Sequence, residues 1–364
     1  MSMENVIQSR QPRNSNLELF RIIVMLLIVA HHYVVNSGLQ PIIIENPTSV
    51  KSMFLYLFGW AGKTGIDCFV LITGYFMCKS NISLRKFLKL FGAFYFYNVF
   101  FFCIFAVTGY AKLSPKFILQ SLLPITSVKD GFVSCYLIFF CFIPFLNILI
   151  KSMNRHQHQL LLGLCLFVYS LFPQMLIKVT FNHVSWFMVI YLIGSYLRLY
   201  PPQWSLSVKR TGWLTFGLVL LSSVSVCVGI QMSCMLKKNI YYFFVSDSNK
   251  PLAVATAVCA FLFFKNLKIG YSKVINTIAA SAFGVLLIHA NSDTMRQWLW
   301  WDTLDNAGHY AGNIYLHAFV SVLIVYATCT LIDIVRIHLL ETPFFRWFDN
   351  YCLKVDSEKK SENL

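Results

Sequence analysis

Residues 16–33 of the chain, NLELFRIIVMLLIVAHHY, form an apolar stretch with ionisable side chains at both ends. A bilayer core needs about 20 mostly apolar residues per helix, so the sequence predicts a membrane-spanning helix over 17–38. This stretch is longer than the core of a signal peptide, and no small-residue cleavage site follows it. We therefore expect the first helix to remain in the membrane.

The same apolar pattern recurs along most of the chain. Of its 364 residues, 57% are hydrophobic and only 12% are charged, against about 25% charged residues in an average soluble domain. This composition excludes a soluble protein. The sequence predicts an all-α, polytopic transmembrane bundle of about ten spanning helices, at 17–38, 53–77, 90–110, 132–150, 159–177, 184–200, 211–233, 250–265, 274–291 and 312–335.

The distribution of positive charge predicts the orientation of the bundle. With a cytoplasmic N-terminus, 20 of the 30 lysines and arginines fall in the inner segments, which are 1–21, 79–89, 151–158, 198–210, 265–273 and 336–364. This bias follows the positive-inside rule, so we expect both termini in the cytoplasm and the bundle in the cell membrane. Membrane lipids account for the formal charge of +15, and nucleic acid is not an expected partner.

One membrane domain is expected over 1–348, followed by a charged, disordered cytoplasmic tail over 349–364. The 11 cysteines fall almost wholly in apolar segments and show no CxxC spacing, which predicts neither a metal site nor a disulfide framework. No internal repeat is visible in the sequence, which counts mildly against a transporter built from repeats.

The first helix carries the most informative pair of ionisable residues. Arg21 and His32 are separated by three helical turns plus about 20°, so they share one face, with His32 about 16 Å further along the axis. Glu18 lies one turn before Arg21 and is expected to hold its guanidinium, whereas His31 points elsewhere. This register suits a long ligand with an anionic head near the cytosol. An interface anchor and a packing histidine remain the alternative reading.

The second helix carries Lys63 and Asp67, which are four residues apart and are expected to form an intramembrane ion pair. Glycines at 59, 62 and 65 would allow another helix to approach closely. An ion pair that only fixes helix packing is the alternative to a functional one.

A basic cluster, Lys79 with LRKFLK at 84–89, follows at the expected cytoplasmic mouth. Phosphate is the natural ligand of such a cluster, and contact with lipid headgroups is the alternative, especially for Arg85. Two further residues, Tyr75 and His289, are candidates for substrate contacts. A single imidazole near a helix end is more often a packing residue, which is the alternative for His289.

Several of these segments resemble one family of membrane enzymes. The run LELFR at 17–21 with His32, the stretch GIDCFVLITGYF at 65–76 and the segment KFLK at 86–89 resemble motifs of the acyltransferase 3 family. Its members O-acylate cell-surface polysaccharides and other acceptors in bacteria. Looser matches lie at 144–147, 191–198, 281–289 and 332–336, in the order found in the polysaccharide O-acetyltransferase branch.

The chain departs from the family pattern at three places. Lys86 and Lys89 stand where the family has an Arg-x-x-Arg pair, which weakens the case for bidentate phosphate binding but not for charge attraction. Thr73 stands where serine is common, and Gly131 lies near the place of a common tryptophan. The chain also lacks the extra-membrane esterase-like domain of some members, so direct acylation of the acceptor or transfer to a separate protein is expected.

The resemblance implies an O-acyltransferase that moves an acyl group, expected to be acetyl, from cytoplasmic acetyl-CoA to a glycan hydroxyl. His32 would act as the base or as a transient acyl carrier, with Lys63 and Asp67 shaping the site and Lys63 as a candidate oxyanion donor. No metal is implied. The expected partners are a cell-surface or lipid-linked glycan acceptor and, as candidates, proteins of envelope polysaccharide synthesis.

The residues expected to hold the acyl donor are Arg21, Glu18, Lys86 and Lys89. Two other classes of protein stay open: a glycan transporter or flippase, and a non-catalytic membrane partner that binds acyl-CoA or glycan. An acyl donor requires both the Arg21–His32 register and the cytoplasmic basic cluster, whereas a glycan path requires neither.

Overall fold

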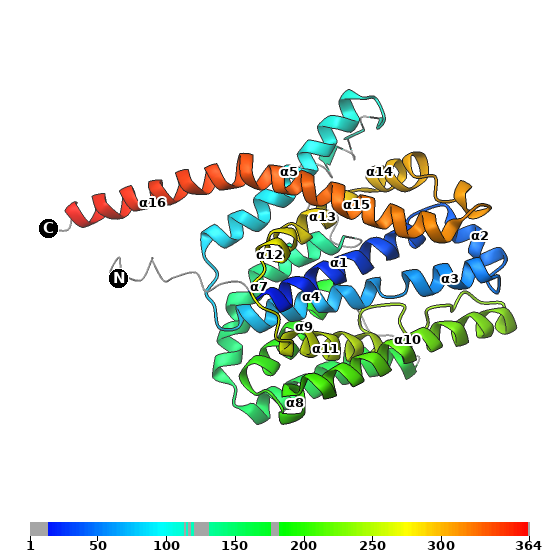
Figure 1. Ribbon diagram of the computed structural model, residues 1–364. Helices are drawn as coiled ribbons and strands as arrows, with labels where there is room; N and C mark the ends of the chain where they lie inside the picture. The colour runs from blue at the N-terminus through cyan, green and yellow to red at the C-terminus, as the bar shows by residue number, and fades with distance from the viewer. Residues whose placement is uncertain (1–13, 113, 116–117, 120–130, 176–181, 363–364) are drawn as a thin grey trace.

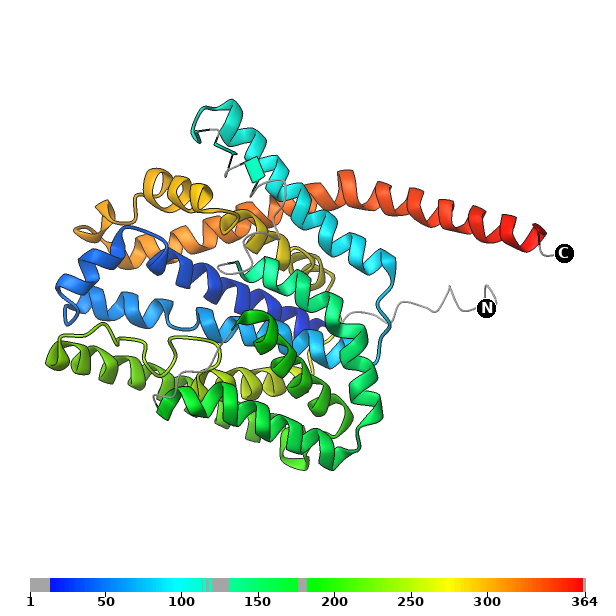
Figure 2. The ribbon, with the colours of Figure 1, turned by 180° about the vertical axis from the view of Figure 1, so that it is seen from behind.

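The computed structural model describes residues 14–112, 114–115, 118–119, 131–175 and 182–362, and these residues contain helices but no strand. The central element is α1 (Ser15–Val35), capped by Asn14, whose side chain accepts from the backbone N–H of Asn16. Its apolar side chains pack on several neighbouring helices, and Figures 1 and 2 show it in the middle of the bundle. A helix that is apolar on all sides suits either a lipid-facing or a central position, and the contacts of α1 with its neighbours give it the central one.

The segment 50–77 forms α3 (Val50–Gly59) and α4 (Gly62–Met77), with a break at Trp60. Its glycines lie against α1. A Cβ on Gly62 would overlap the Cβ of His31, and a Cβ on Gly65 would lie 2.9 Å from the Ile28 side chain. The predicted close approach of another helix at these glycines is confirmed, and the approaching helix is α1.

A second close contact joins α4 to α9 (His183–Leu199). A Cβ on Gly74 would lie 2.6 Å from the carbonyl oxygen of Tyr191, and a Cβ on Gly194 would lie 2.7 Å from that of Leu71. The backbones of the two helices therefore touch directly, because neither glycine carries a side chain.

The remaining helices surround this centre. Figure 1 shows α10 and α11 along one face, and Figure 2 shows α7 and α8 along the opposite face. Their bounds are α2 (Leu39–Glu45), α5 (Leu84–Val107), α7 (Phe132–Ser152), α8 (Arg155–Leu166), α10 (Val208–Leu236), α11 (Pro251–Asn266), α12 (Lys273–Ala280), α13 (Ala282–His289), α14 (Asp293–Arg296), α15 (Ile314–Arg336) and α16 (Thr342–Glu362).

Six helices of the described residues are long and apolar enough to cross a membrane, namely Ser15–Val35, Val50–Met77, Leu84–Val107, Phe132–Ser152, Val208–Leu236 and Ile314–Cys352. A seventh is added if Lys273–His289, which meets Asp293–Thr303 at a bend of 94°, counts as one broken span. These helices make the chain a multi-pass membrane protein and match six of the ten predicted spans.

The other predicted spans, at 159–177, 184–200, 250–265 and 274–291, are helical where described but do not meet this length by themselves. α11 has 16 residues, about 24 Å, which is shorter than the bilayer core of about 30 Å. The helix that begins at Arg155 changes to a π-helix at Phe167 and to a 3-10 helix at Phe172, and residues 176–177 lie outside the described residues. Ten spans are therefore not confirmed.

We call the end of the bundle where α1 begins at Ser15 the proximal end, and the end where it finishes at Val35 the distal end. The long helix α16 leaves the bundle at the proximal end (Figure 1). α16 continues to Glu362, and the disorder predicted for 349–364 stays a prediction. Lysine and glutamate, which are good helix formers, are frequent in this tail and extend a helix already started by α15.

Candidate active site

Arg21 lies on α1 near the proximal end and is held by an acidic neighbour. Its Nη1 is 2.9 Å from Oε1 of Glu18, whose side chain is 8% exposed while that of Arg21 is 30% exposed. The predicted contact between Glu18 and Arg21 is therefore confirmed. The partly exposed guanidinium keeps donors for a further anion, since one carboxylate oxygen occupies only one of its five N–H groups.

His32 forms a hydrogen bond with a second histidine, at the end of α13. Nδ1 of His32 is 2.9 Å from Nε2 of His289, and Nδ1 of His289 is 2.6 Å from the carbonyl oxygen of Val285. A carbonyl can only accept, so Nδ1 of His289 carries the proton. In its neutral form His289 then accepts at Nε2 from the Nδ1–H of His32.

This chain of two bonds leaves Nε2 of His32 as a free acceptor. His289 is fully buried, whereas His32 is only half-buried, so part of the His32 side chain stays exposed. The neighbouring His31 is directed elsewhere, because its Nδ1 bonds the carbonyl oxygen of Gly59 at 2.6 Å. His31 and His32 thus bond different partners, in agreement with the expectation that His31 points elsewhere.

The predicted ion pair between Lys63 and Asp67 is wrong. Asp67 is fully buried, and its Oδ1 accepts from the indole N–H of Trp186 on α9 at 2.9 Å. No ion pair joins Lys63 to Asp67 in the described part of the chain. The prediction used only the helical spacing of the two residues. In the structure the carboxyl group of Asp67 is instead bonded across the α4–α9 contact. The longer lysine side chain lies close enough to His32 for their charges to interact.

Arg296 of α14 is a second cation beside the histidine pair, and the sequence analysis missed it. Its charge acts on both His32 and His289. The guanidinium bonds Asp293 at 2.8 Å, and its buried Nε has no partner among the described residues. The one sequence signal for Arg296 was its position seven residues after His289, just beyond the bend between α13 and α14. Lys63, which follows Gly62 at the contact with His31, and Arg296, which follows His289 by seven residues, are therefore candidate cations near the histidine pair.

A pair of hydroxyl groups lies between the histidine pair and the proximal end. Oγ1 of Thr73 donates to the carbonyl oxygen of Phe69 at 3.1 Å and is 2.8 Å from the hydroxyl of Tyr136 on α7. Since the threonine proton is used, Tyr136 donates to Thr73. On α4, Thr73 lies between Gly62, which packs on His31, and the end of the helix at Met77.

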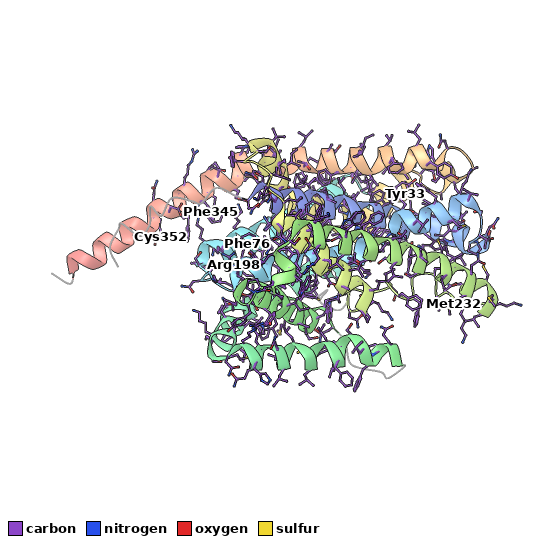
Figure 3. All side chains as sticks on the ribbon, turned by 60° about the horizontal axis from the view of Figure 1, so that its bottom comes forward. Tyr33, Phe76, Arg198, Met232, Phe345 and Cys352 are labelled. Carbon is purple, nitrogen blue, oxygen red and sulfur yellow. The ribbon has the colours of Figure 1, made fainter. Side chains whose placement is uncertain are left out.

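Tyr75 lies at the proximal end, away from the histidine pair. Its hydroxyl accepts from Nη1 of Arg198 at 2.8 Å, and the guanidinium stands over its ring at 4.7 Å. Figure 3 shows Arg198 toward the same end as Cys352 and Tyr33 further along the bundle. The two side chains predicted to contact substrate, Tyr75 and His289, are therefore separated by much of the length of α4.

The basic cluster at the start of α5 is partly neutralised by the C-terminal helix. Lys89 forms an ion pair of 2.6 Å with Glu341, and Arg85 forms one of 3.2 Å with Asp349. Lys86 has no carboxylate partner in the described residues; its amine bonds the hydroxyl of Ser80 and, at 2.9 Å, the carbonyl oxygen of Asn81. Of the two predicted phosphate-binding lysines, only Lys86 is thus free of an acidic partner. No cluster of three potential metal ligands lies within the described ranges.

Comparison with known proteins adds one match. A family model described as an acyltransferase domain, that of the acyltransferase 3 family, matches residues 14–333. This range begins just before α1 and includes both histidines of the pair and α4. No curated protein and no solved structure matches the chain. The match identifies a membrane acyltransferase, in agreement with the apolar helices. The chain belongs to the acyltransferase 3 family.

Proposed function

We propose that this protein is an O-acyltransferase of the cell membrane that transfers an acetyl group from acetyl-CoA to a hydroxyl of a cell-surface or lipid-linked glycan. The observation that carries the proposal is the His32–His289 pair, in which Nε2 of His32 has no hydrogen bond within the described part of the chain. A thioester is already activated, so the enzyme must mainly deprotonate the acceptor hydroxyl and hold both reactants together.

The tautomers of the pair define the route of the proton during transfer, because His32 carries its proton on Nδ1 and can accept one at Nε2. The acceptor hydroxyl gives its proton to Nε2 of His32 as its oxygen forms a bond to the thioester carbon. His32, now carrying protons on both nitrogens, keeps its Nδ1–H bonded to His289. When the carbon–sulfur bond breaks, the proton passes from Nε2 to the departing thiolate, which restores the enzyme. In the alternative route, Nε2 first takes the acetyl group and then passes it to the hydroxyl.

Lys63 and Arg296 would stabilise the negative oxygen of the tetrahedral intermediate. Lys63 follows Gly62, which packs on His31, and Arg296 follows His289 by seven residues, which supports a place for both cations near the thioester carbonyl. Loss of one such donor typically costs about 10²–10³ in kcat. Asp67 would support this region indirectly, by fixing α4 against Trp186.

In this proposal the proximal end faces the cytoplasm. The positive-inside bias of the sequence supports that orientation. The acyl donor would enter there, pass Arg21 held by Glu18, and present its thioester to His32 about 16 Å further along α1. Lys86 and Lys89 would attract the donor at the entrance. The glycan would reach the same point from the distal side, supplied by proteins of envelope polysaccharide synthesis.

The test compares two neighbouring histidines. Asparagine keeps an N–H donor near the position of Nδ1 but provides no base, so His32→Asn retains the bond to His289 while losing the reactive nitrogen. We expect His32→Asn to abolish transfer from radiolabelled acetyl-CoA to an envelope glycan, with normal detergent behaviour. His31→Asn, which retains the bond to Gly59, is the matched control and should stay active. Full activity of His32→Asn would refute the assignment.

A further inference from the structure

A cavity of about 460 Å³ opens at the proximal end, between the C-terminal ends of α4, α7 and α9. Its polar lining comes from Lys79, Ser80, Asn81, Asn147, Lys151 and Tyr200. Cavities of about 300–1,000 Å³ are the usual size for small-molecule sites. No aspartate or glutamate lines it.

Four cations surround this cavity. Lys79 and Lys151 line it, and Lys86 reaches its rim by bonding Ser80 and Asn81. Arg198 directly precedes the lining residues Leu199 and Tyr200, and its guanidinium bonds Tyr75, three residues before the lining residue Cys78.

None of these four cations has an acidic partner within the described ranges, in contrast to Arg21, Arg85 and Lys89, which pair with Glu18, Asp349 and Glu341. Unpaired cations around a concave, acid-free surface attract a ligand with several negative charges. Phosphate groups are the ligand chemistry that fits.

The wall of the cavity is fixed before any ligand binds. The side-chain amide of Asn147, which is 8% exposed, donates to the carbonyl oxygens of Met77 and Ser80 at 3.0 and 3.3 Å. Its oxygen accepts from the hydroxyl of Tyr191 at 2.6 Å. The turn that carries Lys79 is thereby tied to α7 and α9, so binding need not order it.

The distance from this cavity to the histidine pair sets the length of the ligand. Cys78 at the cavity and Lys63 beside His32 are 15 residues apart, which is about 22 Å along α4. A donor that occupies both places must carry its phosphates far from its reactive carbonyl. Acyl-CoA has this form, with a phosphorylated adenosine at one end, a thioester at the other and a flexible arm between them.

We propose that this cavity binds the phosphorylated nucleotide head of the acyl donor, through Lys79, Lys151, Lys86 and Arg198. The inference rests on the proposed function, because it assumes that the donor's thioester reaches His32. It moves the phosphate contact from Lys89, which Glu341 already neutralises, to the unpaired cations. Arg21, between the cavity and His32, then contacts the arm of the donor.

The test uses adenosine 3′,5′-bisphosphate, which has the head but no thioester, and the full-length protein in a zwitterionic detergent. Binding is measured by calorimetry for the wild type and for Lys79→Gln/Lys151→Gln. Because charge-assisted bonds are the strongest polar contacts, we expect at least a tenfold loss of affinity in the variant. A similar rise should appear in the KM for acetyl-CoA. The control is Lys268→Gln, an exposed proximal lysine outside the cavity, which should bind normally.

Two results would overturn the proposal. The first is equal bisphosphate affinity of wild type and double variant, when both melt at the same temperature without ligand. The second is a wild-type protein that does not bind the bisphosphate but is stabilised against unfolding by phosphatidylglycerol in mixed micelles, while the double variant is not. The cavity would then hold a lipid headgroup. Bisphosphate binding without any acyl transfer would refute the proposed function and leave the nucleotide site standing.

Discussion

Replacing His289 by alanine tests whether this residue positions His32. His289 bonds the reactive imidazole at Nδ1, at 2.9 Å, and leaves Nε2 to the acceptor hydroxyl. Without that acceptor, neutral His32 can place its proton on Nε2, where it blocks proton abstraction. The doubly protonated form also loses a partner.

The size of the effect follows from that single bond. Leaving a buried donor without an acceptor costs about 1–3 kcal/mol, or roughly 5- to 150-fold in rate. Because His32 is half-buried, water can replace part of the lost acceptor, so we expect a fall of about tenfold in kcat. The KM for acetyl-CoA should change little, since His289 is not placed on the donor's path.

The assay is the initial rate of acetyl transfer at varied acetyl-CoA, with the melting temperature as a measure of folding. His289→Gln is the conservative partner variant, because its amide oxygen can accept from Nδ1 of His32 and should restore most of the rate. A folded His289→Ala protein with kcat within about twofold of the wild type would refute the positioning role.

Three further predictions follow from the same contacts. Arg21→Ala should raise the KM for acetyl-CoA about tenfold and remove part of the thermal stabilisation by this donor; unchanged values would favour the membrane-anchor reading. Gly62→Ala should lower stability by about 1–3 kcal/mol in thermal unfolding because its Cβ overlaps His31, whereas Gly92→Ala, which meets nothing within 4 Å, should not; equal melting temperatures would contradict this. Asp67→Asn, which still accepts from the indole, should fold normally, whereas Asp67→Leu should lose about 1–3 kcal/mol; the opposite order of melting temperatures would count against this hydrogen bond.

The sequence predicted well where the relevant contacts are local. Glu18 and Arg21 are one helical turn apart, so the period of the helix alone brought them together. The same period separated His31 from His32. The glycines of α4 were correctly assigned to close helix contact, because the absence of a side chain has the same effect whichever helix approaches.

Contacts between distant segments could not be predicted in this way. His32 and His289 are 257 residues apart, and no spacing rule connects residues of separate helices. Asp67 was assigned to Lys63 because helical period is the only geometry that a sequence displays, while its actual partner, Trp186, lies 119 residues away. At this buried position the indole N–H bonds one oxygen of Asp67 within the α4–α9 contact without bringing a second charge into the core.

The number of spanning helices was uncertain for a related reason. Apolar composition does not distinguish a helix facing lipid from a short helix buried among other helices. α9 has 17 residues and is largely buried against α4 and α7, so it is apolar because of its protein neighbours. Local breaks at Phe167 and Ser281 likewise interrupt runs that hydrophobicity alone reads as continuous.

The backbone contact between α4 and α9 has a consequence for saturation mutagenesis. Codons 74 and 194 should tolerate only glycine, because any Cβ there would meet a carbonyl oxygen of the facing helix. Glycines 163 and 217, which meet nothing within 4 Å, should accept many residues. A selection for active clones would therefore show two strictly constrained positions that never touch a reactant. Substitutions at these two glycines would fail because the helices could no longer pack, whereas substitutions of His32 would fail because the reactive nitrogen is lost.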